Sequence, residues 1–328
     1  MQVRLSVQRH HPEAEPRSWW QEYTVEVPEH ATVLDALLEV RDGQDDSLTL
    51  RCSCRSHICG SCVMKVNGRS ALGCKTKVSK ALERSGAEGV IRVQPAGNMP
   101  VVKDLAVDLE GFFGKVAAVK PWLQPTGPAP EREYIVSNAA MLNVREAMAC
   151  ILCGACVSEC NTLEVDGRFL GPAALAKAWR FTEDPRDGMT AERLGLLASV
   201  PGGIWDCTHC FACVEVCPKD VRPMDRILEL RRRAMEFGFN DSNGSRHSQA
   251  FHDTIAHSGW LDEARVAVRS LHGFDELVDW VGVGIRSFLR GKVPLRHKPI
   301  PGALRVKAIF LAADRHAPRG PGPHPGGA

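Results

Sequence analysis

The fold is decided by two stretches, Cys150-Ile-Leu-Cys153-Gly-Ala-Cys156-Val-Ser-Glu-Cys160 and Cys207-Thr-His-Cys210-Phe-Ala-Cys213-Val-Glu-Val-Cys217-Pro218. Both have the spacing Cys-x2-Cys-x2-Cys-x3-Cys, which holds two iron-sulfur clusters. The first three cysteines of such a run surround one cluster, and the fourth reaches across to the other. A zinc ribbon needs two Cys-x2-Cys pairs and has no use for a third and a fourth cysteine in each run. The two runs therefore predict a pair of clusters that share their ligands.

The composition limits what kind of protein this is. The chain has 328 residues, enough for two domains and an extension, and its 41 basic residues nearly balance 39 acidic ones. That balance gives no reason to expect a nucleic-acid partner. Thirteen cysteines, an odd number grouped in Cys-x2-Cys pairs, indicate metal binding in a reducing compartment. We expect neither a signal peptide nor a spanning helix, so any membrane contact is peripheral or through a partner.

Residues 1–103 have the pattern of a small domain built on a sheet. Alternating polar and apolar residues at 2–9 and 22–27 predict a hairpin. Apolar residues at helical spacing then predict a helix that Thr32 caps and that ends near Gly43. A short strand at 63–66 leads into the turn Asn67-Gly68.

A second kind of cysteine spacing lies in this small domain. Its ligand candidates follow the pattern Cys-x4-Cys-x2-Cys with a distant fourth, which is typical of a plant-type [2Fe-2S] cluster; they are Cys54, Cys59, Cys62 and Cys74. Gly60 and Ser61 are small enough for the loop to wrap closely around a cluster. Cys52 breaks the spacing and is expected to be a free thiol. We expect His57 to occupy a left-handed backbone position in the loop, and not to be a ligand.

Residues 104–240 are expected to form a helical domain that contains both cysteine runs. Apolar spacing predicts a connecting helix that starts at Asp104, includes residues 104–113 and is ended by the segment at Pro121. Further helices are expected at 143–148, 172–181, 191–197 and 224–236.

The third cluster can be interpreted in two ways. With Cys160, Cys207 and Cys213 alone as ligands it is a [3Fe-4S] cluster, and Cys210 is spare. With Cys210 at the fourth corner it becomes a second [4Fe-4S] cluster. The regular two-residue spacing on both sides of Cys210 favours the second interpretation.

In the order of these motifs the chain resembles the iron-sulfur subunit of succinate dehydrogenase and fumarate reductase. The likeness covers residues 1–237 and includes Val102-Lys-Asp-Leu, Lys120-Pro-Trp-Leu, Phe169-Leu-Gly-Pro-Ala-Ala-Leu and Arg180-Phe. The resemblance implies an α+β fold, with an N-terminal β-grasp [2Fe-2S] ferredoxin domain before the all-helical two-cluster domain. It also implies that the [2Fe-2S] ligands are those given above, and that the [4Fe-4S] ligands are Cys150, Cys153, Cys156 and Cys217. The third cluster, [3Fe-4S] in most of the family, would have Cys160, Cys207 and Cys213.

The chain departs from the family at three places. Cys210 stands where most members have a residue that is not a ligand. The sequence Asn161-Thr-Leu-Glu-Val165 stands where the family usually has Pro-Ser and a pair of tryptophans that helps to form the quinone pocket. Thr208 stands at the place of the family's quinone-site histidine. These departures weigh against a quinone site built by this chain.

Residues 241–328 form an extension beyond the usual family length. We expect it to be helical, with a disordered Pro/Gly-rich tail from about residue 318. Its segments Phe288-Leu-Arg-Gly-Lys-Val-Pro-Leu and His297-Lys-Pro-Ile-Pro-Gly resemble those of iron-sulfur proteins that work with cysteine-rich, heterodisulfide-reductase-like subunits. The membrane-anchor partner is therefore expected to be such a subunit or one of cytochrome b type.

The leading hypothesis is an electron-transfer subunit. Single electrons would pass from an FAD-containing flavoprotein subunit through [2Fe-2S], [4Fe-4S] and the third cluster to the anchor subunit and the quinone pool, or the reverse. The organic substrate would react in the partner, because no GxGxxG follows a strand in this chain. We expect the chain to be cytoplasmic, held at the inner face of the membrane by its partners.

Two other hypotheses stay open at this point. The first is the iron-sulfur subunit of a thiol:fumarate, heterodisulfide or glycolate oxidoreductase, which the C-terminal segments favour. The second is a protein without redox function that uses four-cysteine zinc sites as structural staples. The co-purifying flavoprotein distinguishes the first from the leading hypothesis, and metal analysis distinguishes the second.

Overall fold

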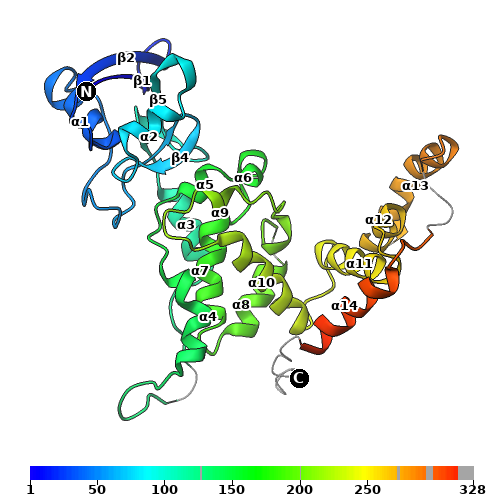
Figure 1. Ribbon diagram of the computed structural model, residues 1–328. Helices are drawn as coiled ribbons and strands as arrows, with labels where there is room; N and C mark the ends of the chain where they lie inside the picture. The colour runs from blue at the N-terminus through cyan, green and yellow to red at the C-terminus, as the bar shows by residue number, and fades with distance from the viewer. Residues whose placement is uncertain (126–127, 200, 272–273, 293–297, 317–328) are drawn as a thin grey trace. The chain divides into compact units, whose positions relative to one another are not determined.

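The chain forms two compact units in the computed structural model, which describes residues 1–125, 128–199, 201–271, 274–292 and 298–316 (Figure 1). The first unit comprises Met1–Arg193 and Cys207–Glu229, and the second comprises Leu194–Asp206 and the chain from Leu230 onward. All thirteen cysteines lie in the first unit. The domain boundaries at residues 103 and 240 stay a prediction.

A mixed five-stranded sheet forms the N-terminal part of the first unit. Its order is β2-β1-β5-β3-β4, and β1 pairs in parallel with β5 while the other neighbours are antiparallel. The strands are β1 Gln2–His10, β2 Ser18–Glu26, β3 Val63–Val66, β4 Arg69–Leu72 and β5 Val90–Gln94. Alternation along β1 buries Val3, Leu5 and Val7 in the core. The expected hairpin is confirmed, although its second strand begins earlier, at Ser18.

Helix α1 (Val33–Gly43) follows the hairpin and contributes Leu37 and Val40 to the core of the sheet. Thr32 caps it as expected, and Asp35 completes a capping box by accepting from the Thr32 backbone N–H at 2.8 Å. The Asn67-Gly68 turn is also confirmed, since both residues have a left-handed backbone with φ of 50° and 79°. Helices α2 (Val78–Glu83) and η1 (Gly86–Glu88) then lead into β5.

The connecting helix begins later than the sequence predicted. Residues Val101–Lys103 and Ala106–Val107 form a second small sheet, β6 and β7, and helix α3 covers only Glu110–Ala118. The predicted helical start at Asp104 is wrong because Asp104 has φ of 45° in the turn between these strands. Its carboxylate accepts hydrogen bonds from the backbone of His10 and Thr49, which holds the turn on the ferredoxin core.

Helices carry the remainder of the first unit and continue into the second. They are α4 Asn138–Met148, α5 Ala155–Ser158, α6 Asn161–Val165, α7 Pro172–Thr182, α8 Thr190–Ser199, η2 Ile204–Asp206, α9 Ala212–Glu215 and α10 Pro223–Glu236. The four helices expected in this region are confirmed within a few residues. Helix α7 starts at Pro172, which occupies the favoured first turn, and nine of its 11 residues are buried. It is therefore a central support of the cysteine runs.

Among the described residues, the second unit contains four helices that follow residue 241. They are α11 Asn243–Ser258, α12 Glu263–Ser270, α13 Phe274–Leu289 and α14 Ala303–His316. A capping box at Ser242 starts α11, and Gly259 ends it against the side chain of Ile300. The expected disordered tail lies outside the described residues. Within those residues, no helix has the length and apolar character needed to cross a membrane.

Candidate metal centres

The first centre is a loop whose backbone amides point at a sulfur atom. Cys54 Sγ accepts hydrogen bonds from the N–H groups of Ser56, Ile58 and Cys59 at 3.3–3.4 Å. These bonds lower the pKa of Cys54 to about 6, with the one from Ser56 contributing most. The left-handed backbone of His57 (φ 49°), expected from the sequence, helps to turn the amides inward. The loop is thus built to stabilise a thiolate at Cys54.

The other predicted ligands of this centre lie close by. Cys62 and Cys74 are buried, and their sulfur atoms are 3.3 Å apart. Burial is the main cause that raises the pKa of Cys62 to about 12; a hydrogen bond from the Cys74 backbone opposes it, and the Cys74 and Cys59 thiols add to it. Cys59 influences both Cys54 and Cys62, so the structure brings all four thiols together. Cys52 instead lies beside Arg41, whose pKa is raised mainly by Asp42 and then by Cys52.

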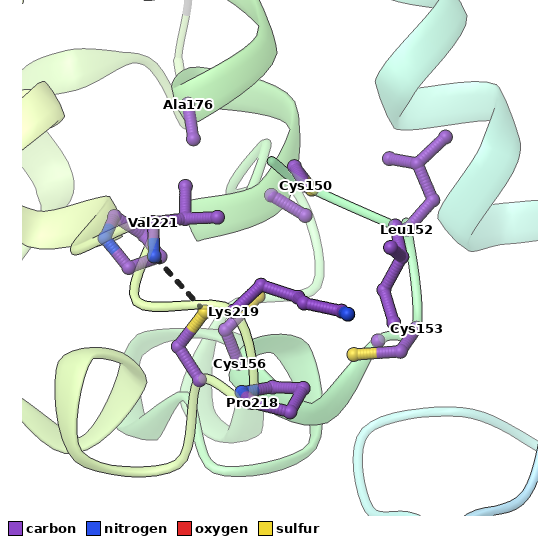
Figure 2. Close-up of a pocket in the computed structure, with 13 residues that line it drawn as sticks. Cys150, Leu152, Cys153, Cys156, Ala176, Pro218, Lys219 and Val221 are labelled. Atoms are coloured by element: carbon purple, nitrogen blue, oxygen red, sulfur yellow. Dashed lines mark hydrogen bonds between the residues drawn. The ribbon is translucent and has the colours of Figure 1, made fainter. Parts of the chain in front are cut away.

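The second group of thiols surrounds a pocket, with about 370 Å³ of empty space that is partly open to solvent. Figure 2 shows Cys150 and Cys153 on one side of this pocket and Val221 on the other, with Cys156 and Pro218 beside each other between them. The Val221 backbone N–H donates to Cys217 Sγ at 3.4 Å, while Ala173 and Ala176 of α7 form an apolar wall. Burial is the main cause that raises the pKa of Cys153 to about 11 and that of Cys156 well above its usual value.

The third group joins the last cysteine of the first run to the first three cysteines of the second run. Burial, followed by nearby Cys207 and Cys210, raises the pKa of Cys213 to about 12. Burial also raises the pKa of Cys160, and the same two cysteines add to the effect. Cys160 and Cys213 are buried, whereas Cys210 is exposed. The structure therefore places all four predicted thiols, including Cys210, within electrostatic reach of one another.

The two runs share one backbone conformation. Leu152 and His209 stand at equivalent positions with φ of 54° and 58°, and Gly154 and Phe211 are left-handed two residues later. Each of the latter pair begins a short helix, α5 or α9, in which the next cysteine lies. A residue other than glycine costs free energy in the left-handed region. Because Leu152, His209 and Phe211 all adopt it, the loops require this geometry.

The surroundings of these thiols fit multi-iron clusters. The thiols of the second group line the wall of a pocket, and amides point at Cys54 and Cys217 as they do toward cluster sulfurs. Thiols whose pKa is raised by burial must lose their protons when metal binds.

Comparison with known proteins agrees with this division of the chain. A family model described as a 2Fe-2S iron-sulfur cluster binding domain matches residues 4–114, and one described as a 4Fe-4S dicluster domain matches residues 146–221. The 8-methylmenaquinol:fumarate reductase iron-sulfur subunit of Wolinella succinogenes is 36% identical over 244 residues, which are 74% of this chain and 76% of that protein. The chain belongs to the family of iron-sulfur subunits of succinate dehydrogenases and fumarate reductases.

Further relatives of this iron-sulfur subunit show the same relationship. The fumarate reductase iron-sulfur subunit of Mycobacterium tuberculosis is 37% identical and matches 70% of this chain and 92% of its own length. A chain of the Mycobacterium smegmatis Sdh1 complex in the apo form superposes with a TM-score of 0.64 at 25% identity, over 72% of this chain and 96% of that one. The expected fold and the expected role in electron transfer through iron-sulfur clusters are confirmed.

The loops of the iron-sulfur subunit contact one another in series. A Cβ atom added to Gly60 of the first loop would lie 2.7 Å from Cys153 Cβ, so only glycine fits between the first and second groups. The second and third groups also approach each other, since α5, which contains Cys156, contacts α9, which contains Cys213. Burial is the main cause that raises the pKa of Cys156, and Cys213 is among the thiols that add to the effect. The three groups therefore follow one another without an intervening layer of protein at these contacts.

A hydrogen-bonded seam holds the ferredoxin domain of the subunit against its helical domain. Ser158 Oγ accepts from the Gly97 N–H at 2.7 Å and pairs with Ser70 Oγ at 2.6 Å. The neighbouring Glu159 accepts from the Ser70 N–H at 2.9 Å, and Asn98 Nδ2 donates to the Cys160 carbonyl at 3.0 Å. Because Ser158 and Glu159 lie between two predicted ligands, this seam fixes the first cysteine run relative to the [2Fe-2S] loop.

One buried ion pair near the first loop was missed by the sequence interpretation. Arg9 Nε donates to Asp104 Oδ1 at 2.9 Å, and both side chains are almost fully buried. Asp104 also accepts from the Thr49 N–H at 2.8 Å, at the start of the segment that leads to Cys54. The signal was available, because Arg9 continues the inward-facing positions Val3, Leu5 and Val7 of β1. A buried arginine at such a position requires a carboxylate partner.

Proposed function

We propose that this subunit carries single electrons between an FAD-containing flavoprotein subunit and a membrane-anchor subunit of a succinate dehydrogenase or fumarate reductase. The observation that supports this most is the series of contacts between the three cysteine groups: Gly60 lies against Cys153, and α5 with Cys156 lies against α9 with Cys213. When bound, the iron-sulfur clusters supply one-electron carriers whose potentials depend on their hydrogen bonds and burial.

Each group of thiols has its own ligand assignment in this proposal. The [2Fe-2S] ligands are Cys54, Cys59, Cys62 and Cys74; the [4Fe-4S] ligands are Cys150, Cys153, Cys156 and Cys217; the third set is Cys160, Cys207, Cys210 and Cys213. The amides at Cys54 stabilise the charge of the first site. Gly60 sets the approach of the first loop to the second, and α7 shields the second site from water.

We further propose that the third cluster is [4Fe-4S], with Cys210 as a ligand. Two observations support this assignment: Cys210 lies near Cys160 and Cys213, and its run repeats the backbone of the first run. In that repeat Cys210 takes the place of Cys153.

The test is EPR spectroscopy and iron analysis of the anaerobically purified subunit. The proposal requires about 10 irons per chain and no stoichiometric [3Fe-4S] signal in the oxidised protein. Replacing Cys210 with Ser should create that signal and lower the iron content to about 9. Cys52→Ser is the matched control and should change neither quantity. A stoichiometric [3Fe-4S] signal in the unaltered protein would disprove the role of Cys210.

The electron acceptor or donor beyond the third cluster is proposed to be a quinone that the anchor subunit binds. The name of the Wolinella relative includes 8-methylmenaquinol, a quinol substrate of that enzyme. With such an anchor, the subunit would lie at the cytoplasmic face of the membrane. Purifying the native complex and identifying its flavoprotein, its anchor and the substrate that reduces the clusters tests this assignment.

A further inference from the structure

From residue 280 to residue 313 the chain has basic residues and no acidic one, whereas the first two turns of α13 contain Asp275, Glu276 and Asp279. Residues 280–292 and 298–313 contain no Asp or Glu and six cations, Arg286, Arg290, Lys292, Lys298, Arg305 and Lys307. Outside these two segments, 35 basic residues face 39 acidic ones. We call residues 280–292 and 298–313 the C-terminal basic segments. Their charge differs in sign from that of the remaining chain.

Large apolar side chains of α13 lie exposed beside this charge. Val278, Val281, Ile285 and Phe288 are spaced by three and four residues, so they share one face of the helix. Each of them is 49–55% exposed, and Leu289 at the end of the helix is 76% exposed. Monomeric soluble proteins rarely leave a continuous apolar face of this kind in water.

Helix α14 repeats the combination. Leu304 and Ile309 are 84% and 66% exposed, and Arg305 and Lys307 beside them are exposed as well. The opposite side of α14 packs inward, where Phe310 makes an edge contact with His252 of α11 at 4.8 Å between ring centres. The exposed side is therefore one that the second unit leaves uncovered.

We propose that α13 and the C-terminal basic segments dock on the surface of an anionic lipid bilayer. The apolar face of α13 would enter the boundary between headgroups and acyl chains, and the cations would meet the acidic headgroups. Charge complementarity selects this occupant, because the acidic residues of α13 lie only in its first two turns, and the chain from residue 280 to residue 313 has basic residues and no acidic one. Helix α13 has 16 residues, and at about 1.5 Å per residue it is shorter than the hydrocarbon core, so it lies in the interface.

This contact is independent of the electron route. A membrane-anchor subunit would hold the complex at the bilayer through protein contacts, and the C-terminal basic segments would add a direct contact with lipid. The full-length subunit with its clusters intact is sufficient to test it, and turnover is not required.

The first experiment is vesicle flotation of the holo-subunit. Vesicles of phosphatidylcholine alone are compared with vesicles that contain about 30% phosphatidylglycerol, at low and high salt. We expect binding at least tenfold stronger to the anionic vesicles, and weaker binding as salt rises. Equal binding to both vesicle types, or no binding to either, overturns the proposal.

Two sets of variants separate charge from apolar contact. R286Q/R290Q/K292Q should weaken anionic-vesicle binding at least tenfold, whereas K77Q/K80Q/R84Q, which removes the same charge from exposed positions in α2 and at its two ends, should leave it unchanged. I285S/F288S should also weaken binding, and I135S/V165S, at positions 91% and 90% exposed, serves as its control.

The outcome distinguishes lipid from a protein partner. If the α13 variants bind anionic vesicles as well as the parent but fail to bind vesicles that contain the anchor subunit, the helix docks on protein and the proposal is wrong. Unchanged EPR spectra of the variants show that the clusters are intact. A failure here therefore leaves the proposed electron route standing, and failure of that route leaves this contact standing.

Discussion

The two cysteine runs have the same spacing and the same backbone but different surroundings. The run from Cys150 to Cys160 faces a pocket walled by Ala173 and Ala176 of α7, and none of its cysteines is exposed. The run from Cys207 to Cys217 presents Cys210 to solvent, and the neighbouring Phe211 is 49% exposed. Equal local geometry thus lies behind the wall of α7 in the first run, which we call the insulated run, and reaches the surface at Cys210 in the second. A carrier in the middle of a route needs insulation, whereas one at its end must reach a partner.

The largest difference between the two runs should appear when a proposed ligand is removed from the insulated run. Cys156→Ser should abolish the second cluster and greatly lower the thermal stability, because its empty pocket would expose the remaining thiols and the apolar wall to water. Cys210→Ser at the surface should change the cluster type and leave the fold intact. Iron content, EPR and thermal unfolding measure both. Equal loss of stability in the two variants would contradict the difference that we infer.

The next test concerns the contact that links the first loop to the insulated run. Gly60→Ala places a Cβ atom 2.7 Å from Cys153 Cβ, so the two loops must move apart. Electron transfer through the subunit should slow severalfold, because tunnelling rates fall as the distance between the first two clusters increases.

The readout is the rate of reduction of the later clusters from the flavoprotein side, together with the magnetic interaction between the first two clusters. Gly68→Ala is the control, since its added Cβ meets nothing within 4 Å although its φ of 79° is also left-handed. If electron transfer is also slow in the Gly68→Ala variant, backbone strain alone explains the effect.

An ion pair directly after α7, the helix behind the insulated run, predicts that the stability of the fold depends on pH. Asp184, in the turn after α7, has a fully buried carboxylate paired with Arg180 and Arg186. Burial alone would raise its pKa, but the hydrogen bonds from Arg186 and Arg180 lower it to about 2. Because this folded value lies below the unfolded one, 3.8, the pair stabilises the fold above about pH 4 and loses that effect as the pH falls toward 2.

Asp184→Asn should therefore lower the free energy of unfolding by about 2 kcal/mol near pH 7. The difference in stability between variant and parent should become smaller only below about pH 4. Thermal unfolding across this range measures it. Asp166→Asn is the matched control, because Asp166 also has a pKa of about 2, set mainly by Arg168, but lies at the surface. A pH-independent difference for Asp184→Asn would exclude the ion pair as its cause.

The smallest expected effect tests whether the two runs require the same left-handed backbone position. Gly154 and Phe211 hold equivalent left-handed positions, with φ of 82° and 63°. Gly154→Ala should cost about 1–2 kcal/mol, while Phe211→Gly should leave stability within about 1 kcal/mol of the parent. Anaerobic unfolding free energies of both variants measure this pair. If Gly154→Ala is harmless, the insulated loop does not need the conformation that we describe.

Much of the fold followed from local sequence. The strand alternation at Val3, Leu5 and Val7, the cap at Thr32 and the turn at Asn67-Gly68 are confirmed because neighbouring residues alone specify them. The helical start predicted at Asp104 was wrong for a physical reason. Contacts distant in sequence, to His10 and Thr49, overrode a weak helical period.

The sequence by itself determined the family, the number of cysteine groups and the spacing of their members, because cluster ligation imposes fixed intervals along the chain. Only the tertiary structure decided that Gly60 presses on Cys153, that Ser158 and Glu159 join the two domains, and that Arg9 meets Asp104. Spacing describes a chain in one dimension, whereas these contacts join residues about 60 to 95 positions apart. Which thiol is insulated and which is exposed is likewise a property of packing, and it gives two equal motifs different roles.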